Sequence, residues 1–136
     1  MAKLNPYLFF SGNCREAMTF YKEVLGGELV MQTVGDSPMA AKMPPEAKNN
    51  IMHSMLTTDG VALMASDMTD PDQVQGSTMS LCLVCNSKEE IERLFAKLSV
   101  GGTVEHALKE EYFGTFGDLT DKFGMRWMLQ FGMGQK

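Results

Sequence analysis

The feature that most constrains the fold of this 136-residue chain is an internal repeat. A stripe of apolar residues at helical spacing ends in a pair of glycines twice, before Gly26-Gly27 and before Gly101-Gly102. Each stripe follows a short apolar strand and precedes three further strand-like segments. The repeat therefore predicts an α+β fold made of two tandem βαβββ modules, about residues 4–68 and 77–133.

The first module begins with a short aromatic strand and a helix. Asn13 and Glu16, at the start of the helical stripe, resemble a capping box, and Asp59-Gly60 has the composition of a tight hairpin turn. The expected strands cover residues 7–10, 28–34, 51–58 and 61–66, and the expected helix covers residues 14–25.

The second module repeats this order. Ser87 with Glu90 forms a second capping-box pattern, and Gly124 opens the last strand as Gly60 opens the last strand of the first module. The helical stripe contains Ile91, Leu94, Phe95 and Leu98. The expected strands cover residues 78–85, 104–108, about 112–118, and the segment MRWMLQF after Gly124.

Two segments fall outside the repeat. The loop 35–49 contains Pro38, Pro44 and Pro45 and is too long for a simple hairpin connection, so we expect a lid or an arm that contacts a partner. The segment 69–76 is polar, contains Pro71 and is expected to link the two modules within a single domain.

Charge and composition exclude several classes of partner. The net charge of −5 and the isoelectric point near 5.0 leave no basic surplus for nucleic acid or an anionic membrane surface. No apolar stretch approaches the ~20 residues of a membrane helix, and the N-terminus lacks the apolar core of a signal peptide. Three cysteines are too few for a disulfide framework, so we expect free thiols and a cytoplasmic location.

Two motifs resemble a known superfamily. The helix signature FYKEVLGG and the closing DKFGMRWML are similar to the vicinal oxygen chelate superfamily, which includes glyoxalases, fosfomycin-resistance enzymes and extradiol dioxygenases. The opening NPYLFFSGNCREAMTFYKEVLGGEL and the closing LTDKFGMRWM resemble its PhnB-like branch in detail. The resemblance covers nearly the whole chain and implies that each module curls into a half-barrel and that the two enclose a cavity. Because one fold hosts many chemistries, the activity must be argued from the site.

The resemblance also indicates where a metal would bind. Metal-dependent members hold a divalent ion with His, Gln or Glu on the first and last strands of each module. The matching positions here are Met128, four residues after Gly124, and Met64, four residues after Gly60, with the others near Pro6 or Tyr7 and at Met79. A thioether is a poor ligand for Mg²⁺, Mn²⁺ or Zn²⁺, so we expect neither a metal nor another cofactor.

The 13 methionines suggest a different use for the cavity, because methionine is a flexible apolar filler. We expect a small, partly apolar ligand in a metal-free cavity, although ordinary core packing explains the same residues. The candidate ligand-binding residues are Tyr7, Phe9, His53, Met64, Met79, Cys82, Phe113, Trp127 and Met128.

His53 is the one candidate for catalysis. It lies in a strand between Ile51 and Met55, where an imidazole could act as a hydrogen-bond donor or a general base, or simply be a satisfied histidine of the sheet. The pair Cys82 and Cys85 has C-x-x-C spacing, but within a strand residues three apart point to opposite faces, so a redox or zinc site is disfavoured.

Three functions remain open from the sequence. The favoured one is a homodimeric PhnB-like protein that binds a small molecule. The second is a glyoxalase-like isomerase or transferase whose divalent metal is held by His53 and displaced carboxylates such as Glu110 or Glu111. The third is a non-catalytic module that only dimerises.

Overall fold

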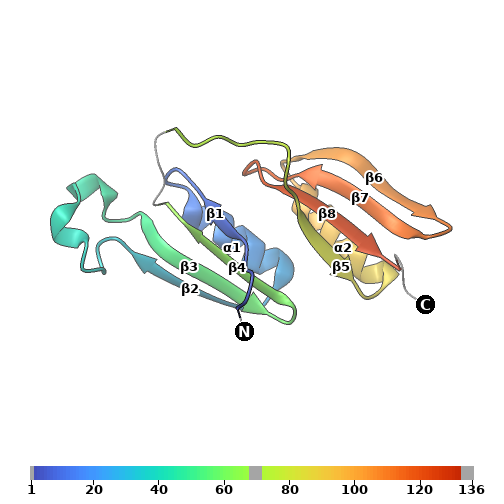
Figure 1. Ribbon diagram of the computed structural model, residues 1–136, viewed down its shortest axis with the longest axis horizontal. Helices are drawn as coiled ribbons and strands as arrows, with labels where there is room; N and C mark the ends of the chain where they lie inside the picture. Colours follow the sequence, from blue (N-terminus) through green and yellow to red (C-terminus); the bar gives the residue numbers. More distant parts are fainter. Residues whose placement is uncertain (1, 68–71, 133–136) are drawn as a thin grey trace. The chain divides into compact units, whose positions relative to one another are not determined.

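The computed structural model describes residues 2–67 and 72–132. The chain divides into two compact units, Met1–Gln73 and Val74–Lys136, and each contains one helix and one four-stranded sheet (Figure 1). The predicted α+β fold of two βαβββ modules is therefore confirmed. The expected module ends at Met68 and Met133, and the linker residues 69–71, lie outside the described residues.

The first unit contains one mixed sheet. Strand β1 pairs in parallel with β4, and the other neighbours are antiparallel, which gives the order β1-β4-β3-β2. The elements are β1 (Tyr7–Phe9), α1 (Cys14–Leu25), β2 (Glu28–Thr33), β3 (Ile51–Thr58) and β4 (Val61–Ser66). Apart from one residue at the ends of β1 and β2, these bounds are the ones that the sequence predicts.

The second unit has the same topology. Its order is β5-β8-β7-β6, with β5 parallel to β8 and the remaining pairs antiparallel. The elements are β5 (Leu81–Cys85), α2 (Lys88–Ser99), β6 (Thr103–Glu111), β7 (Gly114–Thr120) and β8 (Arg126–Phe131). The repeat that was read from the sequence is thus a repeat of strand order as well as of composition.

The sequence misplaced one hairpin in this unit. Residues 112–118 were expected to be a strand, but Tyr112 and Phe113 form the turn between β6 and β7, and β7 extends to Thr120. Two irregularities in the pairing of β6 with β7 lengthen β6 to nine residues. Because such bulges place two residues opposite one, they interrupt the alternation that marks a strand in a sequence.

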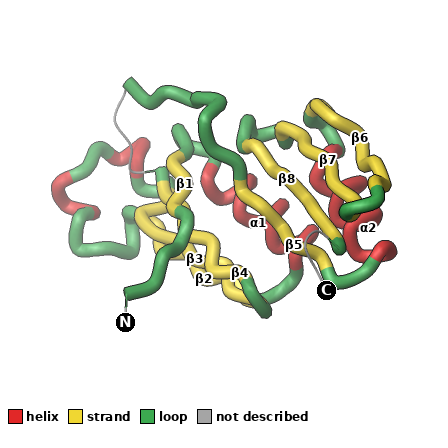
Figure 2. Tube along the Cα trace, turned by 45° about the vertical axis from the view of Figure 1, so that its right-hand side comes forward, coloured by secondary structure: helices red, strands yellow, loops and turns green. Residues whose placement is uncertain are grey.

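Each helix covers one face of its own sheet (Figures 1 and 2). Five side chains of α1 are buried: Cys14, Ala17, Met18, Tyr21 and Val24. In α2 the four residues of the predicted stripe are buried: Ile91, Leu94, Phe95 and Leu98. Alternate residues of the strands, such as Leu56 and Leu129, form the sheet side of the two cores.

The glycine pair after each helix has a steric cause. Gly26 and Gly101 have φ of 76°, a conformation that few other residues adopt. A side chain on Gly27 would collide with the backbone oxygen of Thr57, and one on Gly102 with the backbone oxygen of Thr120. The helix can therefore turn back onto its sheet only if the second position also lacks a side chain.

The N-terminus of α1 is held by a residue far away in the sequence. The Asp67 carboxylate accepts hydrogen bonds from the backbone N–H groups of Gly12 (2.9 Å), Cys14 (3.0 Å) and Ile51 (2.8 Å). Asn13 makes no side-chain capping bond, so the capping box predicted from Asn13 and Glu16 is wrong. Asp67 instead ties the end of β4 to the start of both α1 and β3.

The N-terminus of α2 is capped locally, as the sequence predicts. The Ser87 hydroxyl accepts from the Glu90 N–H at 3.1 Å, and the Glu90 carboxylate accepts from the Asn86 N–H at 2.7 Å. The two helices therefore share a length and a packing mode but are capped in different ways.

The loop 35–49 extends the β2–β3 hairpin. The N–H groups of Val34 and Gly35 donate to the carbonyl groups of Asn50 and Lys48, both at 2.9 Å, which holds the two ends of the loop together. Two short 3-10 helices, Ala40–Lys42 and Pro45–Ala47, form its tip. The role of this loop as a lid or partner arm stays a prediction.

Neither helix described here, each of 12 residues, is long and apolar enough to cross a membrane.

We expect Asp67→Ala to lower the free energy of unfolding by about 2–4 kcal/mol, because three backbone donors lose an ionised acceptor at once. Asn13→Ala is the matched control at the same helix end and should change it by less than about 0.5 kcal/mol. Urea denaturation of both variants tests this. Equal effects of the two substitutions would contradict the assignment of the cap to Asp67.

Candidate functional site

The first sheet presents one face that its helix does not cover. Antiparallel pairing sets Met55 opposite Met64, and parallel pairing sets Met64 beside Tyr7, so these side chains share a face. Phe9 and His53 share it by alternation. The open face therefore brings together four of the ligand-binding residues expected from the sequence: Tyr7, Phe9, His53 and Met64.

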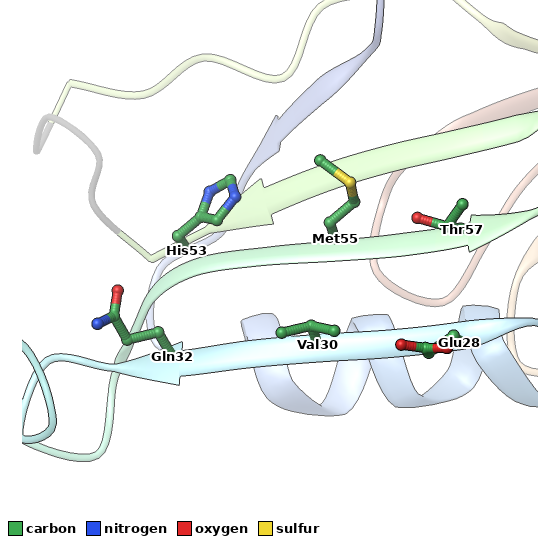
Figure 3. Close-up of a pocket in the computed structure, with 6 residues that line it drawn as sticks. All are labelled: Glu28, Val30, Gln32, His53, Met55 and Thr57. Atoms are coloured by element: carbon green, nitrogen blue, oxygen red, sulfur yellow. The ribbon is translucent and has the colours of Figure 1, made fainter.

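A hollow of about 640 Å³ lies on this face between β2 and β3. Its lining combines apolar, amide, imidazole and carboxylate groups (Figure 3). Three side chains come from β2 and three from β3: Glu28, Val30, Gln32, His53, Met55 and Thr57. Of these six, only His53 was predicted from the sequence as a ligand-binding residue, although the alternation of β2 and β3 around His53 could have identified the other five.

Tyr7 and His53 form a polar pair on the open face. The Tyr7 hydroxyl lies 3.5 Å from Nδ1 of His53, and their ring centroids are 6.0 Å apart. The two side chains reach each other over β4, which lies between β1 and β3. Phe9 extends the aromatic surface, with its ring centroid 5.1 Å from that of Tyr7.

A bulge in β3 lies next to His53. Gln32 pairs with His53, whereas the next residue, Thr33, pairs with Ile51, so Met52 is the extra residue. A bulge locally increases strand twist and redirects the neighbouring side chains, and bulges are frequent beside binding sites. This irregularity distinguishes the His53 end of the hollow from the regular Thr57 end.

The open face of the second sheet is more strongly charged. His106 Nδ1 lies 2.8 Å from an Asp118 carboxylate oxygen, and Lys109 Nζ lies 3.1 Å from Glu111 Oε1. Asp118 pairs across the strands with Met128, which in turn pairs with Cys82. Two further candidates, Cys82 and Met128, are therefore neighbours on this face.

The register corrects one equivalence between the modules. Met79 was expected to match the Tyr7 region, but β5 begins at Leu81, and Met79 is 81% exposed outside the strand. Cys82 pairs with Met128 in the way that Tyr7 pairs with Met64. Cys82, rather than Met79, is thus the residue of the second module that is equivalent to Tyr7.

Trp127 points away from this face. It is 2% exposed and pairs with the buried Leu119, on the side of the sheet that α2 covers. Its indole Nε1 donates to Asp121 at 2.8 Å, and the same carboxylate accepts from the N–H groups of Phe123 (2.8 Å) and Met125 (3.0 Å). Trp127 is therefore a core residue that anchors the β7–β8 turn, not a residue of the open face.

Phe113 lies in the β6–β7 turn and belongs to an aromatic group at the tip of the hairpin. Its ring stacks on that of Phe116 at 5.8 Å and meets the ring of Tyr112 edge-on at 5.1 Å. The turn is exposed, so Phe113 is accessible but separated in sequence and register from Met128 and Cys82.

The three cysteines differ in environment. All are free, and Cys82 is exposed whereas Cys14 and Cys85 are buried, so the prediction that Cys82 and Cys85 face opposite ways is confirmed. Burial raises the pKa of the Cys14 and Cys85 thiols to about 11, and partial desolvation by the neighbouring side chains also raises the pKa of the more exposed Cys82. A raised pKa reduces the thiolate fraction near neutral pH and hence nucleophilicity.

The residues at the superfamily metal positions do not fit a hard divalent ion. They are Tyr7 and Met64 in the first unit and Cys82 and Met128 in the second, which supply a phenol, thioethers and a thiol of raised pKa. Mg²⁺ and Mn²⁺ require carboxylate or carbonyl oxygens, and Zn²⁺ requires thiolate, imidazole or carboxylate. Within residues 2–67 and 72–132, no three His, Cys, Asp or Glu side chains come together as a metal site.

The whole chain is similar to known proteins. A family model described as 3-demethylubiquinone-9 3-methyltransferase matches residues 2–130. The chain belongs to this PhnB-like family. Protein YjdN of Escherichia coli (strain K12) is 33% identical, with 93% of this chain and 92% of that protein covered.

Solved structures agree with this assignment of the family. Protein PA1353 from Pseudomonas aeruginosa is 40% identical, with a TM-score of 0.84 over 98% of this chain and 99% of that chain. The PhnB protein from Bacillus cereus is 28% identical, with a TM-score of 0.78 over 96% and 99%. A glyoxylase/bleomycin resistance protein/dioxygenase domain from Frankia sp. EAN1pec, 16% identical with a TM-score of 0.65 over 100% and 95%, shows the same fold. The resemblance to the PhnB-like branch is confirmed, and the fold is shared with structures named for the glyoxylase/bleomycin resistance/dioxygenase group.

We expect iodoacetamide at pH 8 to alkylate Cys82 at least about tenfold faster than Cys14 or Cys85, because accessibility and thiolate fraction both favour it. The rates at Cys14 and Cys85 should rise as the pH approaches 11, where these thiols ionise. Peptide mass spectrometry after timed labelling measures all three rates. Unfolding in urea should make the rates equal, and equal rates in the native protein would contradict the assigned environments.

Proposed function

We propose that this PhnB-like protein binds a small, partly apolar molecule on the open face of its first sheet. The observation that carries the proposal is the hollow of about 640 Å³ between β2 and β3, with the Tyr7–His53 pair beside it. Small-molecule sites combine an apolar lining with a few polar groups that fix orientation. This face has both.

The lining suggests how such a molecule would be held. Met55 and Val30 offer flexible and branched apolar contacts, and Val30 is 61% exposed although it lies in a sheet. Gln32 and His53, paired across the strands, provide hydrogen-bonding groups at one end. A flat molecule with one polar end and no net charge matches this arrangement.

Catalysis is a separate matter from binding. His53 has a ring nitrogen beyond Nδ1 that could exchange a proton with a bound molecule, so it is the residue on which a reaction would depend. Among the described residues, no three His, Cys, Asp or Glu side chains come together that could hold a metal ion. We therefore place binding first and treat the metal-dependent isomerase or transferase as an outcome for the experiment to detect.

We propose further that two copies associate and that the two units of each chain work as one cytoplasmic domain. The open faces expose large apolar side chains, including Phe9, Val30 and Val84, at 45–62% of their surface. Apolar area of this kind is favourably removed from water by a second copy. The loop 35–49 is the segment expected to contact the partner or to close the cavity.

We expect labelled methionine methyl groups to report the ligand site. In protein carrying [methyl-¹³C]methionine, the neutral probe benzamide should shift the Met55 and Met64 signals saturably and leave the buried Met18 signal unchanged. Tyr7→Phe and His53→Ala should each weaken binding about three- to tenfold, since each removes one hydrogen-bonding group.

The control variant is His106→Ala, which removes a histidine from the open face of the other unit and should leave benzamide binding unchanged. Shifts of equal size at every methionine, or none at Met55, would refute the proposed site. Stoichiometric divalent metal that survives dialysis and is lost in His53→Ala would favour the metal-dependent enzyme instead.

We expect light scattering at micromolar concentration to give a mass of about twice the 15.1 kDa of one chain, because of the exposed apolar faces. Val30→Lys and Val84→Lys should shift the equilibrium toward the monomer. The matched control is Val100→Lys, which alters an equally exposed valine at the end of α2 instead. A monomer at all concentrations would rule out the dimer and leave the ligand proposal untouched.

A further inference from the structure

Arg126 is a partly buried cation on the open face of the second sheet, and it has no partner among the residues that the structure describes. It is the first residue of β8, lies across the strands from Thr120, and is half-buried. Its Nε has no contact with solvent and no hydrogen-bond partner, and no other side-chain nitrogen or oxygen of the described residues is in that state. Buried donors are nearly always paired, so this exception points to a missing acceptor.

The acidic side chains on the same face are already engaged. Asp118 contacts His106 at 2.8 Å, Glu111 contacts Lys109 at 3.1 Å, and Glu105 accepts from the Thr120 hydroxyl at 3.2 Å. Over residues 2–67 and 72–132, no carboxylate forms an ion pair with Arg126. A guanidinium that is partly removed from water and not neutralised is unfavourable, and an added anion would relieve this.

We propose that Arg126 binds the carboxylate of a small organic molecule on the open face of the second sheet. Nε is the one side-chain nitrogen of Arg126 that is both buried and without a hydrogen-bond partner, and the two terminal nitrogens of a guanidinium can donate a pair of parallel hydrogen bonds to one carboxylate. The partial burial of the guanidinium strengthens such a pair relative to one at a fully exposed arginine.

The neighbours favour a singly charged organic anion. Met128 and Cys82 lie next along this face and are exposed, which gives an apolar surface for the rest of the molecule. A second negative charge on the ligand would be repelled by two carboxylates. Asp118 is the residue of β7 next to Thr120 on the same face, and Glu105 accepts from the Thr120 hydroxyl. A doubly charged phosphate is therefore a poorer match than a monocarboxylate.

This site goes beyond the proposed function, because it lies on the sheet of the other unit and uses neither Tyr7 nor His53. The two sites also prefer different ligands, a neutral polar end on the first sheet and a carboxylate on the second. Benzamide and benzoate, which have nearly the same shape and differ in charge, separate them.

The test is a titration of [methyl-¹³C]methionine protein with benzoate. We expect saturable shifts at Met128 and a binding constant at least tenfold weaker in Arg126→Gln. The matched control is Arg93→Gln, which removes the same charge from an exposed position on α2 of the same unit and should leave benzoate binding unchanged. Fluorescence of Trp127, the one tryptophan of the chain, verifies that each variant is folded.

A second measurement does not depend on ligand binding. Without any anion, Arg126→Met should raise the melting temperature, because it removes an unpaired donor and a partly buried charge while keeping the apolar stem. Arg93→Met should leave the melting temperature unchanged. A lowered melting temperature in Arg126→Met would show that the guanidinium is already satisfied and would overturn the proposal.

Two ligand comparisons complete the test. Benzamide should leave Met128 unshifted, and inorganic phosphate should compete with benzoate only weakly. Benzoate binding that survives Arg126→Gln, or phosphate binding tighter than benzoate, would overturn the assignment of a monocarboxylate to Arg126. Neither result would alter the benzamide response at Met55, so failure here is distinguishable from failure of the proposed function.

Discussion

A four-stranded sheet with a single covering helix can bury only one of its two faces. In each unit the face toward α1 or α2 carries the core, and the opposite face must be left to solvent, a ligand or another chain. Here the uncovered faces carry side chains as large as Phe9, Val30 and Met128, which water solvates poorly. The two binding sites proposed for this protein therefore lie on these two sheet faces.

The fold was largely predictable because its signals are local and occur twice. The spacing of Ile91, Leu94 and Leu98 sets one face of a helix, and Gly101-Gly102 is required where the chain must pass close to Thr120. The cap of α1 could not be found in this way, since Asp67 lies 53 residues from Cys14 and no local pattern connects them. The β6–β7 turn was misplaced because bulges interrupt the alternation on which strand prediction depends.

The candidate site was less predictable than the fold, and the reason is strand register. Sequence spacing sets Met64 and Met128 at equivalent places in β4 and β8, and the register agrees, because each lies four residues after the glycine that precedes its strand. It misplaced Met79, since the start of β5 cannot be fixed from residues 78–85 alone. Trp127 was predicted to contact the ligand. Its neighbours Arg126 and Met128 lie on the open face, so by alternation the indole lies in the core, where the Asp121 carboxylate accepts a hydrogen bond from its N–H group.

The two open faces differ in the chemistry that they can support. The first combines apolar side chains with the hydrogen-bonding pair of Tyr7 and His53, so it selects by shape and by one or two hydrogen bonds. The second carries the His106–Asp118 and Lys109–Glu111 contacts, and within residues 2–67 and 72–132 the guanidinium of Arg126 has no such partner. The thioethers of Met64 and Met128 are poor donors to a hard divalent ion, so they supply no strong, directional bond that would orient a bound molecule. A bound molecule must then be oriented by the polar side chains of the strands, because a flexible thioether side chain adapts its shape to almost any neighbour.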